Sequence, residues 1–406
     1  MSENGYPIRD ALLARQISRR RLLKTTLAVP LVVATPSFAA IDIAQAAGSS
    51  SPKGDFAPAL AADGLAIETS SALGIDAKAL HTVLKGVQGG AANIHSVLVL
   101  RHGKLAAELY RPGFDRSIYS LWASRRQFAP AELHDMRSVS KSIVGLLYGI
   151  LLNRGETPGI DTSVSSLYPE CSALHDTSRR EIRIRHLLTM SAGLEWTEPS
   201  PVRRASSTDE IGLALRPCAY SYVFQRDVVA PPGTQFTYSG GLTAVLAEIM
   251  ERSTKRSLRQ IAEENLFVPL GITDWEWVED IYGNPMAPAG LRLKPRDLMK
   301  IGAMMLAGGE WQGQRIVPAA WIARSIKPSI MTAPIGGYGF QWWSMTIRWK
   351  DRDLSVTAAI GNGGQRLFLV PDLDLAIVTT AGDYGDPAIA TPTNAILHSV
   401  VRTVLV

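Results

Sequence analysis

The sequence predicts an α/β (α+β) fold, with an antiparallel sheet flanked by helices plus a mainly helical subdomain. Two hairpin patterns, at 97–110 and at 367–380, lie far apart in the 406-residue chain. Between them, residues of about 145–330 carry apolar positions with helical period. We therefore expect one sheet built from both ends of the chain, with the helical subdomain inserted between them.

Local patterns justify each of these elements. Both hairpins have turn residues between their apolar runs, a glycine within 101–104 and Pro-Asp at 371–372. Helical spacing is clearest at 242–251 and 297–307, and the final stretch, 388–406, should form a helix that packs on the sheet. With 46% hydrophobic residues, the chain can bury a large core.

The first 46 residues are predicted to be a signal peptide. Residues 18–24 read Ser-Arg-Arg-Arg-Leu-Leu-Lys, which resembles the twin-arginine (Tat) export motif, and an apolar stretch with small-residue sites follows. A membrane anchor is the alternative, but Pro30 and Pro36 interrupt a run that is short for a span of about 20 residues. We expect cleavage near Ala46, no stable membrane anchor afterwards, and a periplasmic or secreted protein.

The charge balance does not favour nucleic-acid binding. The chain has 42 Lys and Arg against 37 Asp and Glu, and without residues 1–46 it keeps 36 basic and 34 acidic residues, a net charge of +2. No nucleic-acid partner is expected, because it would need a concentrated basic face. Cys171 and Cys218 could form one disulfide in an oxidising compartment or remain two free thiols.

A hydroxyl and an amine lie three residues apart at the start of a predicted helix. Ser138 and Lys141 precede the apolar run 143–152, so they share one helix face beside the unpaired N–H groups of the first turn. The serine can act as a nucleophile if the lysine accepts its proton, which requires burial to lower the lysine pKa from about 10.4 to about 7. The pattern alone is weak, because Ser50 and Lys53 also form an S-x-x-K.

Two later segments strengthen the catalytic interpretation. A turn-rich loop at 232–241 delivers Tyr238 directly before a predicted helix, and a glycine-rich turn at 361–365 enters an apolar strand. With these three motifs in order from Ser138 onward, the chain resembles a serine hydrolase superfamily. That superfamily contains class C β-lactamases, D-alanyl-D-alanine carboxypeptidases, family VIII esterases and 6-aminohexanoate-dimer hydrolases.

The resemblance implies a β-lactamase/transpeptidase-like fold with its site in a cleft between the two parts. Ser138 would attack a carbonyl carbon and form an acyl-enzyme, with Lys141 and Tyr238 acting as a coupled base. Trp196 follows another family-like phrase, 186–194, and is expected at the cleft rim. The site residues that the resemblance implies are, as catalytic residues, Ser138, Lys141 and Tyr238; as backbone donors of an oxyanion hole, Ser138 and Gln365; and as substrate-binding residues, Gly240, Asn362, Gly363, Gly364 and Trp196.

Two departures from the family pattern bear on the substrate. Position 240 is glycine where the lactamases carry an asparagine, and Asn362 stands where they carry a cation, so it offers a substrate carboxylate a hydrogen bond but no charge. We therefore expect an exported hydrolase of a small ester or uncharged amide, esterase-like or 6-aminohexanoate-oligomer-hydrolase-like. The alternatives are a D-peptidase, penicillin-binding protein or weak β-lactamase, and a non-catalytic binding or sensor protein on the same fold.

Other chemistries have little support in the sequence. There is no G-x-S-x-G, the seven histidines show no H-E-x-x-H or H-x-H spacing, and no phosphate-binding glycine motif occurs. We expect neither a metal nor a cofactor. The predicted organisation is a Tat-type signal peptide at 1–46, a linker at 47–70 and a β-lactamase-related serine hydrolase domain at 71–406.

Overall fold

The central feature of the computed structural model is a nine-stranded sheet in which both ends of the chain take part. The structure describes residues 55–118, 120, 122–198, 209–333 and 336–405. The strand order is β1-β3-β2-β16-β15-β14-β13-β12-β11, and its neighbouring strands are antiparallel except β1 with β3. These strands are β1 (Ala66–Ile67), β2 (Ile94–Arg101), β3 (Lys104–Tyr110), β11 (Ile330–Thr332), β12 (Gly336–Tyr338), β13 (Trp343–Trp349), β14 (Arg352–Gly361), β15 (Gln365–Val370) and β16 (Leu375–Ala381).

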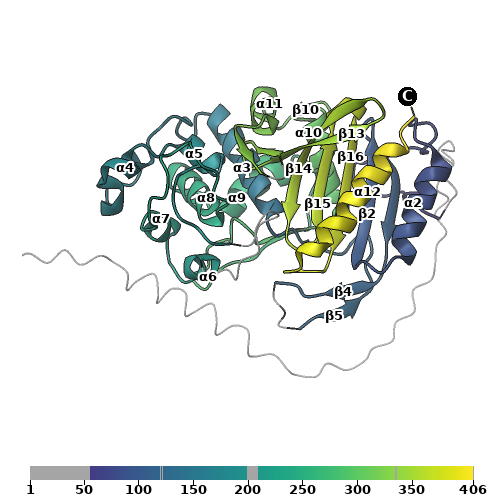
Figure 1. Ribbon diagram of the computed structural model, residues 1–406, viewed down its shortest axis with the longest axis horizontal. Coiled ribbons are helices and arrows are strands. Elements are labelled where there is room, and N and C mark those ends of the chain that lie inside the picture. The colour runs from purple at the N-terminus through teal and green to yellow at the C-terminus, as the bar shows by residue number, and fades with distance from the viewer. Residues whose placement is uncertain (1–54, 119, 121, 199–208, 334–335, 406) are drawn as a thin grey trace, which may run out of the picture. The chain divides into compact units, whose positions relative to one another are not determined.

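Both predicted hairpins are confirmed. Arg101 pairs with Lys104 across the turn between β2 and β3, and the two residues between them have φ values of 50° and 68°, the positive values that a type I′ turn requires. The second hairpin pairs β15 with β16. Because β16 also pairs with β2, the two hairpins lie side by side in one sheet (Figure 1).

Three smaller sheets lie outside the large one. They pair β4 with β5, β9 with β10, and β8 with both β6 and β7. Their strands are β4 (Gly113–Asp115), β5 (Ser124–Arg126), β6 (His134–Asp135), β7 (Glu276–Trp277), β8 (Leu291–Leu293), β9 (Glu310–Trp311) and β10 (Gln314–Arg315). The β6–β8 pair matters for the site, because β6 leads directly into the segment that carries Ser138.

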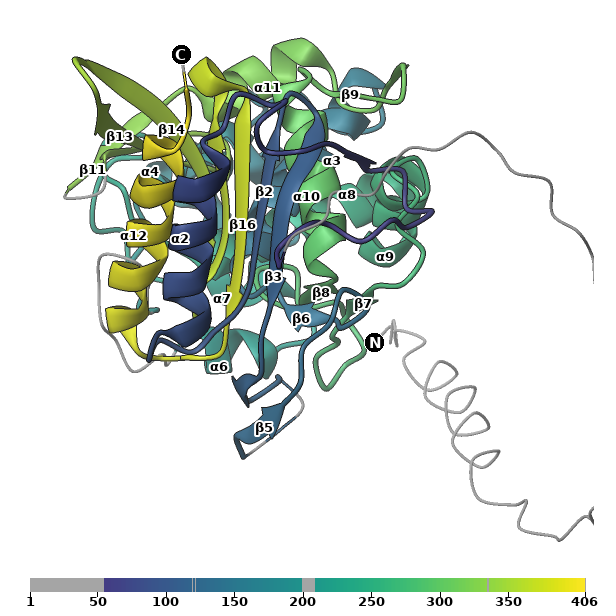
Figure 2. The same cartoon turned by 90° about the vertical axis from the view of Figure 1, so that its right-hand side faces the viewer.

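Helices cover both faces of the large sheet. The covering helices are α2 (Ala77–Gly89), α10 (Pro295–Leu306), α11 (Ala319–Ile326) and α12 (Ala390–Arg402). α2 and α12 lie side by side on one face, and α10 lies against β2, β15 and β16 on the other (Figure 2). Every residue of β15 and β16 is buried, which explains why these strands read as nearly continuous apolar runs in the sequence.

The helical part of the chain is built around two long helices, α3 and α8. Its helices are α3 (Val139–Asn153), α4 (Thr177–Arg180), α5 (Ile184–Leu188), α6 (Asp209–Ala214), α7 (Ala219–Val223), α8 (Gly240–Thr254) and α9 (Leu258–Ala262). The predicted range of 145–330 extends too far, because α10 falls within it and packs on the sheet. The helical part therefore ends before α10, because the apolar face of α10 packs on the central strands of the large sheet.

The predicted linker at 47–70 is anchored over its second part. Phe56 is buried, β1 extends the sheet, and the Ala59 backbone N–H donates to the Glu108 carboxylate at 2.8 Å. Arg296 donates to the same carboxylate at 2.7 Å and to the Ala59 carbonyl at 2.6 Å. From residue 55 onward the linker prediction is therefore wrong, and the predicted signal peptide lies outside the described residues.

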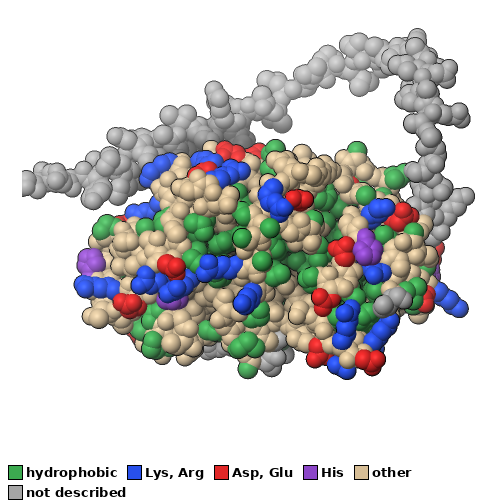
Figure 3. Space-filling view, turned by 90° about the horizontal axis from the view of Figure 1, so that it is seen from above, with side chains coloured by type: hydrophobic (Ala, Val, Ile, Leu, Met, Phe, Trp, Pro, Cys, Tyr) green, Lys and Arg blue, Asp and Glu red, His purple; other side chains and the backbone are tan. Residues whose placement is uncertain are grey.

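The surface carries charges of both signs. Seen from above, hydrophobic side chains gather near the middle of the face, and basic and acidic side chains lie interspersed around them (Figure 3). Arg256, for example, pairs with both Glu156 and Glu264. Across the ranges that the structure describes, no helix combines the length and apolar character needed to cross a membrane.

α3 is buried on nearly all sides, as expected of a helix that is apolar all round. Every residue from Val139 to Leu151 is buried. Trp321 of α11 packs directly on Gly149, and its indole N–H donates to the Gly145 carbonyl at 3.0 Å. A Cβ atom at Gly149 would lie 2.2 Å from the Trp321 ring, so glycine is required for α11 to approach α3.

Gly149→Ala should therefore destabilise the protein, by about 1–3 kcal/mol, because the new methyl group overpacks the helix contact. Gly86→Ala is the matched control, since Gly86 is exposed in the middle of α2 and a Cβ there meets nothing within 4 Å. That control should stabilise by about 0.5–1 kcal/mol through helix propensity. Urea unfolding of both variants measures this contrast, and equal effects would contradict the packing argument.

Candidate active site

Ser138 stands at the first turn of α3 with its hydroxyl available. Arg137, directly before it, has a φ of 49°, a left-handed conformation that turns the chain from β6 into the helix. The Ser138 side chain caps no helical N–H. Instead its Oγ accepts a hydrogen bond from Lys141 Nζ at 3.0 Å, so the structure brings together the first predicted pair.

Lys141 is buried in a polar cage. Its side chain is 1% exposed, and its ammonium also donates to the Glu198 carboxylate at 3.1 Å and to the Pro288 carbonyl at 3.3 Å. Burial alone would lower the pKa of Lys141, but the attraction of Glu198 and Tyr238 outweighs it and raises that pKa above the ordinary value. The sequence expectation of a lysine pKa near 7 is therefore wrong for the resting site, because the lysine has a buried carboxylate partner.

Glu198 is the residue that sequence reasoning missed. It is 3% exposed and receives three hydrogen bonds, from Lys141, from the Trp196 indole at 2.7 Å and from the Gly240 backbone N–H at 2.5 Å. These donors come from three different segments of the chain. No local motif marks a carboxylate that lies 57 positions from its lysine, so only the fold reveals this partner.

Trp196 does not lie at the cleft rim. It is 3% exposed, its indole N–H is committed to Glu198, and its ring packs edge-on against Tyr222 at 5.9 Å. A Cβ atom at Gly241 would lie 2.6 Å from the indole, which shows how closely α8 covers it. The rim prediction is corrected: Trp196 supports the carboxylate from within the core.

Tyr238 lies at the meeting point of the helical part and the sheet. Its ring packs against Phe236, Tyr338 and Trp343, and Lys141 Nζ lies 4.7 Å from its centroid. Burial raises the pKa of the Tyr238 phenol, while the Lys141 charge and interactions with the Lys141 and Ser138 side chains act against that shift. The resting tyrosine is thus a phenol close to a cation, and the three residues of the first two motifs converge.

Gly240 is enclosed and offers no exposed surface for a substrate. Its N–H is bonded to Glu198, and a Cβ atom there would lie 2.9 Å from that carboxylate and 3.1 Å from Pro288. The space beside the second motif is therefore filled by the Glu198 carboxylate. This explains why glycine stands at a position where the lactamases carry an asparagine.

The third motif forms the turn between β14 and β15. Gly363 and Gly364 have φ values of 85° and 100°, and both pack closely on side chains of the following segment. Asn362 is exposed, and its side-chain oxygen accepts a hydrogen bond from the Gly385 N–H at 2.8 Å. Gly361 places the turn beside the nucleophile candidate, because a Cβ atom there would lie 2.3 Å from the Met136 carbonyl.

Gln365 is poorly placed to bind a substrate oxygen. It is 0% exposed, and its side chain bonds to the Ala381 carbonyl at 2.5 Å and to the Ala381 N–H at 3.3 Å. A donor to a developing oxyanion has to be reachable, so the predicted role of the Gln365 N–H is not supported. The backbone N–H groups of Ser138 and Asn362 each lack a hydrogen-bond acceptor among the described residues.

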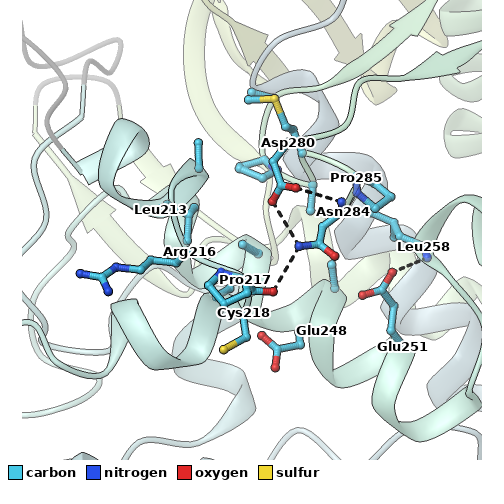
Figure 4. Close-up of a pocket in the computed structure, with 18 of the residues that line it drawn as sticks. Leu213, Arg216, Pro217, Cys218, Glu248, Glu251, Leu258, Asp280, Asn284 and Pro285 are labelled. Carbon is cyan, nitrogen blue, oxygen red and sulfur yellow. Dashed lines mark hydrogen bonds between the residues drawn. The ribbon is translucent and has the colours of Figure 1, made fainter. Parts of the chain in front are cut away.

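A hollow of about 220 Å³, which Pro288 helps to line, lies in the helical part of the chain (Figure 4). Helices α6 and α8 and the loop at 280–289 supply most of its walls, and neither Ser138 nor Tyr238 lines it. Arg216 points away from this hollow, while Glu248 and Glu251 extend from α8 toward it. Burial raises the pKa of Glu248 to about 7.

The structure also bears on the cysteines and on metal binding. Cys171 and Cys218 are both free thiols in the structure. Of the two alternatives that the sequence left open, a disulfide or two free thiols, the structure has the free thiols. Within the described ranges, no group of three or more His, Cys, Asp or Glu side chains is arranged to hold a metal ion. The converging groups of the site are thus a hydroxyl, an amine, a phenol and a carboxylate.

Comparison with known families accounts for this arrangement. The model of the Beta-lactamase family matches residues 82–398, which is most of the chain. The chain belongs to the β-lactamase family. It is a β-lactamase-family serine hydrolase with a β-lactamase/transpeptidase-like fold, so the alternative of a non-catalytic binding protein is not supported.

The named relatives of this β-lactamase-family protein include several hydrolases. The chain is 29% identical over 302 residues to the 6-aminohexanoate-dimer hydrolase of Paenarthrobacter ureafaciens, covering 69% of this chain and 70% of that protein. It is 30% identical over 190 residues to Esterase EstB of Burkholderia gladioli, covering 45% and 46% of the two chains. The penicillin-binding protein of Bacillus halodurans shares the fold, with a TM-score of 0.59, 15% identity and coverage of 79% and 99%.

Trp196→Phe should destabilise this β-lactamase-family protein by about 1–3 kcal/mol, because it keeps an aromatic ring but removes one donor from a buried carboxylate. Trp275→Phe is the control, since the Trp275 indole N–H has no hydrogen-bond acceptor among the described residues and its ring packs on Phe267. Urea unfolding compares the two variants. A loss no larger than that of the control would show that the Glu198 hydrogen bond contributes little.

Proposed function

We propose that the protein cleaves a small ester or uncharged amide through an acyl-enzyme on Ser138. The observation that carries the proposal is the hydrogen bond of 3.0 Å from Lys141 Nζ to Ser138 Oγ at the first turn of α3, beside a buried tyrosine. The Ser138 backbone N–H has no acceptor among the described residues, and the start of the helix supplies positive partial charge where an oxyanion would form. This combination suits acyl transfer to a hydroxyl nucleophile.

The proposed reaction proceeds in balanced steps. The Lys141–Tyr238 pair first loses one proton to solvent. Ser138 Oγ then attacks the carbonyl carbon, its proton passes to the deprotonated pair, and the carbonyl electron pair moves onto the oxygen. When the tetrahedral intermediate collapses, the pair returns that proton to the departing oxygen or nitrogen. Water then repeats the sequence on the acyl-enzyme. Lys141 and Tyr238 titrate together as neighbours, so the base is the pair and not one member.

The proposed oxyanion hole uses the backbone N–H groups of Ser138 and Asn362. Both lack an acceptor among the described residues, and Gly361 holds the turn against Met136, two residues before the nucleophile. One such donor is worth about 3 kcal/mol in acyl transfer. Asn362 replaces Gln365 in this role because Gln365 is fully enclosed.

The substrate class follows from the charges near the turn. Asn362 gives the third motif no exposed cation, and Arg366 on β15 is 5% exposed, so a β-lactam or a D-Ala-D-Ala terminus would lack a charged partner for its carboxylate at this motif. The named relatives include esterases and a 6-aminohexanoate-dimer hydrolase, which supports an ester or a linear amide as the substrate.

We also propose export by the twin-arginine route on the basis of Arg19 and Arg20. A cell-fractionation assay of the full chain and of an Arg19→Lys/Arg20→Lys variant tests this proposal.

Hydrolysis of p-nitrophenyl butyrate tests the nucleophile. The wild-type protein should release p-nitrophenol with an initial burst, and Ser138→Ala should abolish release because no acyl-enzyme can form. Ser50→Ala, in the other S-x-x-K of the sequence, is the matched control and should leave the rate unchanged. Equal rates for Ser138→Ala and wild type would remove Ser138 as the nucleophile.

Glu198→Gln should shift the rising limb of the pH profile of kcat/KM to lower pH. Glu198 raises the pKa of Lys141, so removing its charge lets the Lys141–Tyr238 pair lose its proton at lower pH. The amide keeps the shape of the side chain. Glu195→Gln, an exposed neighbour, should leave the profile in place. A limb that stays fixed in Glu198→Gln would show that this carboxylate has no electrostatic effect on the base.

A further inference from the structure

Arg366, the second residue of β15, is a buried cation without a carboxylate partner. It is 5% exposed, and its guanidinium makes two hydrogen bonds through Nη1, to the Gly361 carbonyl at 2.7 Å and to the Gln365 carbonyl at 2.9 Å. No acidic side chain bonds to it within the described residues, since both of its hydrogen bonds go to backbone carbonyls. A buried charge of this kind is rare, because leaving water costs free energy that a counter-ion normally offsets.

The position of Arg366 links two motifs of the proposed site. Gly361 and Gln365 are the pair that closes the turn between β14 and β15, so the guanidinium bridges the two ends of the turn that carries Asn362. Burial lowers the pKa of Arg366 to about 10, and the neighbouring Tyr238 is the titratable group whose charge acts against that shift. Arg366 therefore holds the third motif by two hydrogen bonds and lies within electrostatic reach of the tyrosine of the second.

Arg366 has no carboxylate bonded to it among the described residues. Lys141 and Glu198 form a buried pair of opposite sign at 3.1 Å, Glu210 of α6 also attracts Lys141, and Tyr238 is a phenol. Negative charge first appears here when the Lys141–Tyr238 pair loses its proton, and it passes to the substrate oxygen as Ser138 attacks. A fixed cation nearby favours both of these charged stages and does not tighten binding of the uncharged substrate, so it lowers the barrier.

We propose that Arg366 is a positioning residue of the acyl transfer, which holds the Asn362 turn through the Gly361 and Gln365 carbonyls and favours negative charge on Tyr238 and on the substrate oxygen. This inference rests on the proposed function. The competing explanation is that Arg366 is only a structural clamp for the turn. The two explanations differ in the effect of charge, since a clamp needs hydrogen bonds whereas the electrostatic role needs the positive charge as well.

Two substitutions separate these explanations. Arg366→Gln removes the charge and keeps one amide donor, whereas Arg366→Lys keeps the charge and loses the planar fork. For p-nitrophenyl butyrate, Arg366→Gln should lower kcat about 10-fold or more with little change in KM, and Arg366→Lys should lose less. Arg348→Gln, an exposed arginine on β13 that pairs with Asp353, is the control and should change neither constant.

The pH profile gives a readout that a clamp would not move. Among the described residues, the charged and titratable groups that act on the Lys141–Tyr238 pair are Glu198, Glu210 of α6, Tyr338 of β12 and Arg366 itself. Removing the cation makes the Lys141–Tyr238 pair harder to deprotonate, so Arg366→Gln should move the rising limb of kcat/KM to higher pH by about one unit. Arg366→Lys should leave the limb in place. A limb unmoved in Arg366→Gln overturns the electrostatic role.

A measurement without turnover keeps this test separate from the proposed function. Phenolate absorbance in the ultraviolet, taken as wild type minus Tyr238→Phe, reports the titration of Tyr238 whether or not an ester is cleaved. Arg366→Gln should raise its midpoint and Arg366→Lys should not. An unchanged midpoint overturns the inference even if the esterase activity is real. A shifted midpoint without ester hydrolysis would support the inference and count against the proposed substrate class. Circular dichroism checks that each variant is folded.

Discussion

The buried ion pair between Lys141 and Glu198 is the interaction on which the rest of the site depends. Both side chains are 1% exposed, so each has given up its contact with water and must be satisfied within the protein. The carboxylate is satisfied by donors from α3, from the Trp196 segment and from the start of α8. One pair of charges thus fixes three segments around the proposed nucleophile, and it explains why residue 240 has no room for a side chain.

The aromatic wall around Tyr238 completes this arrangement. Phe236, Tyr238, Tyr338 and Trp343 pack on one another with ring centroids 4.9–6.4 Å apart, and they join the loop before α8 to β12 and β13. Such a wall keeps water away from the ion pair, so the charges interact in a medium of low polarity. The groups that set the acidity of the proposed base therefore come from both the helical part and the sheet.

The local motifs of the sequence were enough to single out the three residues that converge at the proposed site. Ser138 and Lys141 share a helix face by their spacing alone, and the hairpins and the C-terminal helix follow from turn residues and periodicity. Glu198 could not be found, because its role depends on a contact across 57 residues. The same reason explains the errors for Trp196 and Gln365, whose sequence positions suggest access to the site while tertiary packing encloses them.

The segment before β1 shows a different limit of sequence reasoning. Its Ala- and Ser-rich composition is typical of a linker, yet Arg296 and Glu108 form a buried pair that binds its backbone. Composition describes the segment itself and not the surface that it meets. The polar partner lies on β3 and α10, far along the chain, so only the folded structure reveals the anchor.

The pairing of β16 between β2 and β15 has a consequence for the synthesis of the protein. Ser138, Lys141 and Tyr238 are synthesised well before β16. The turn between β14 and β15 cannot take its final position until β16 joins the two halves of the sheet. Contacts so distant in sequence form late and slowly. A chain truncated before β16 would carry the proposed catalytic groups but not the strand that seats this turn, so we expect it to have no hydrolytic activity.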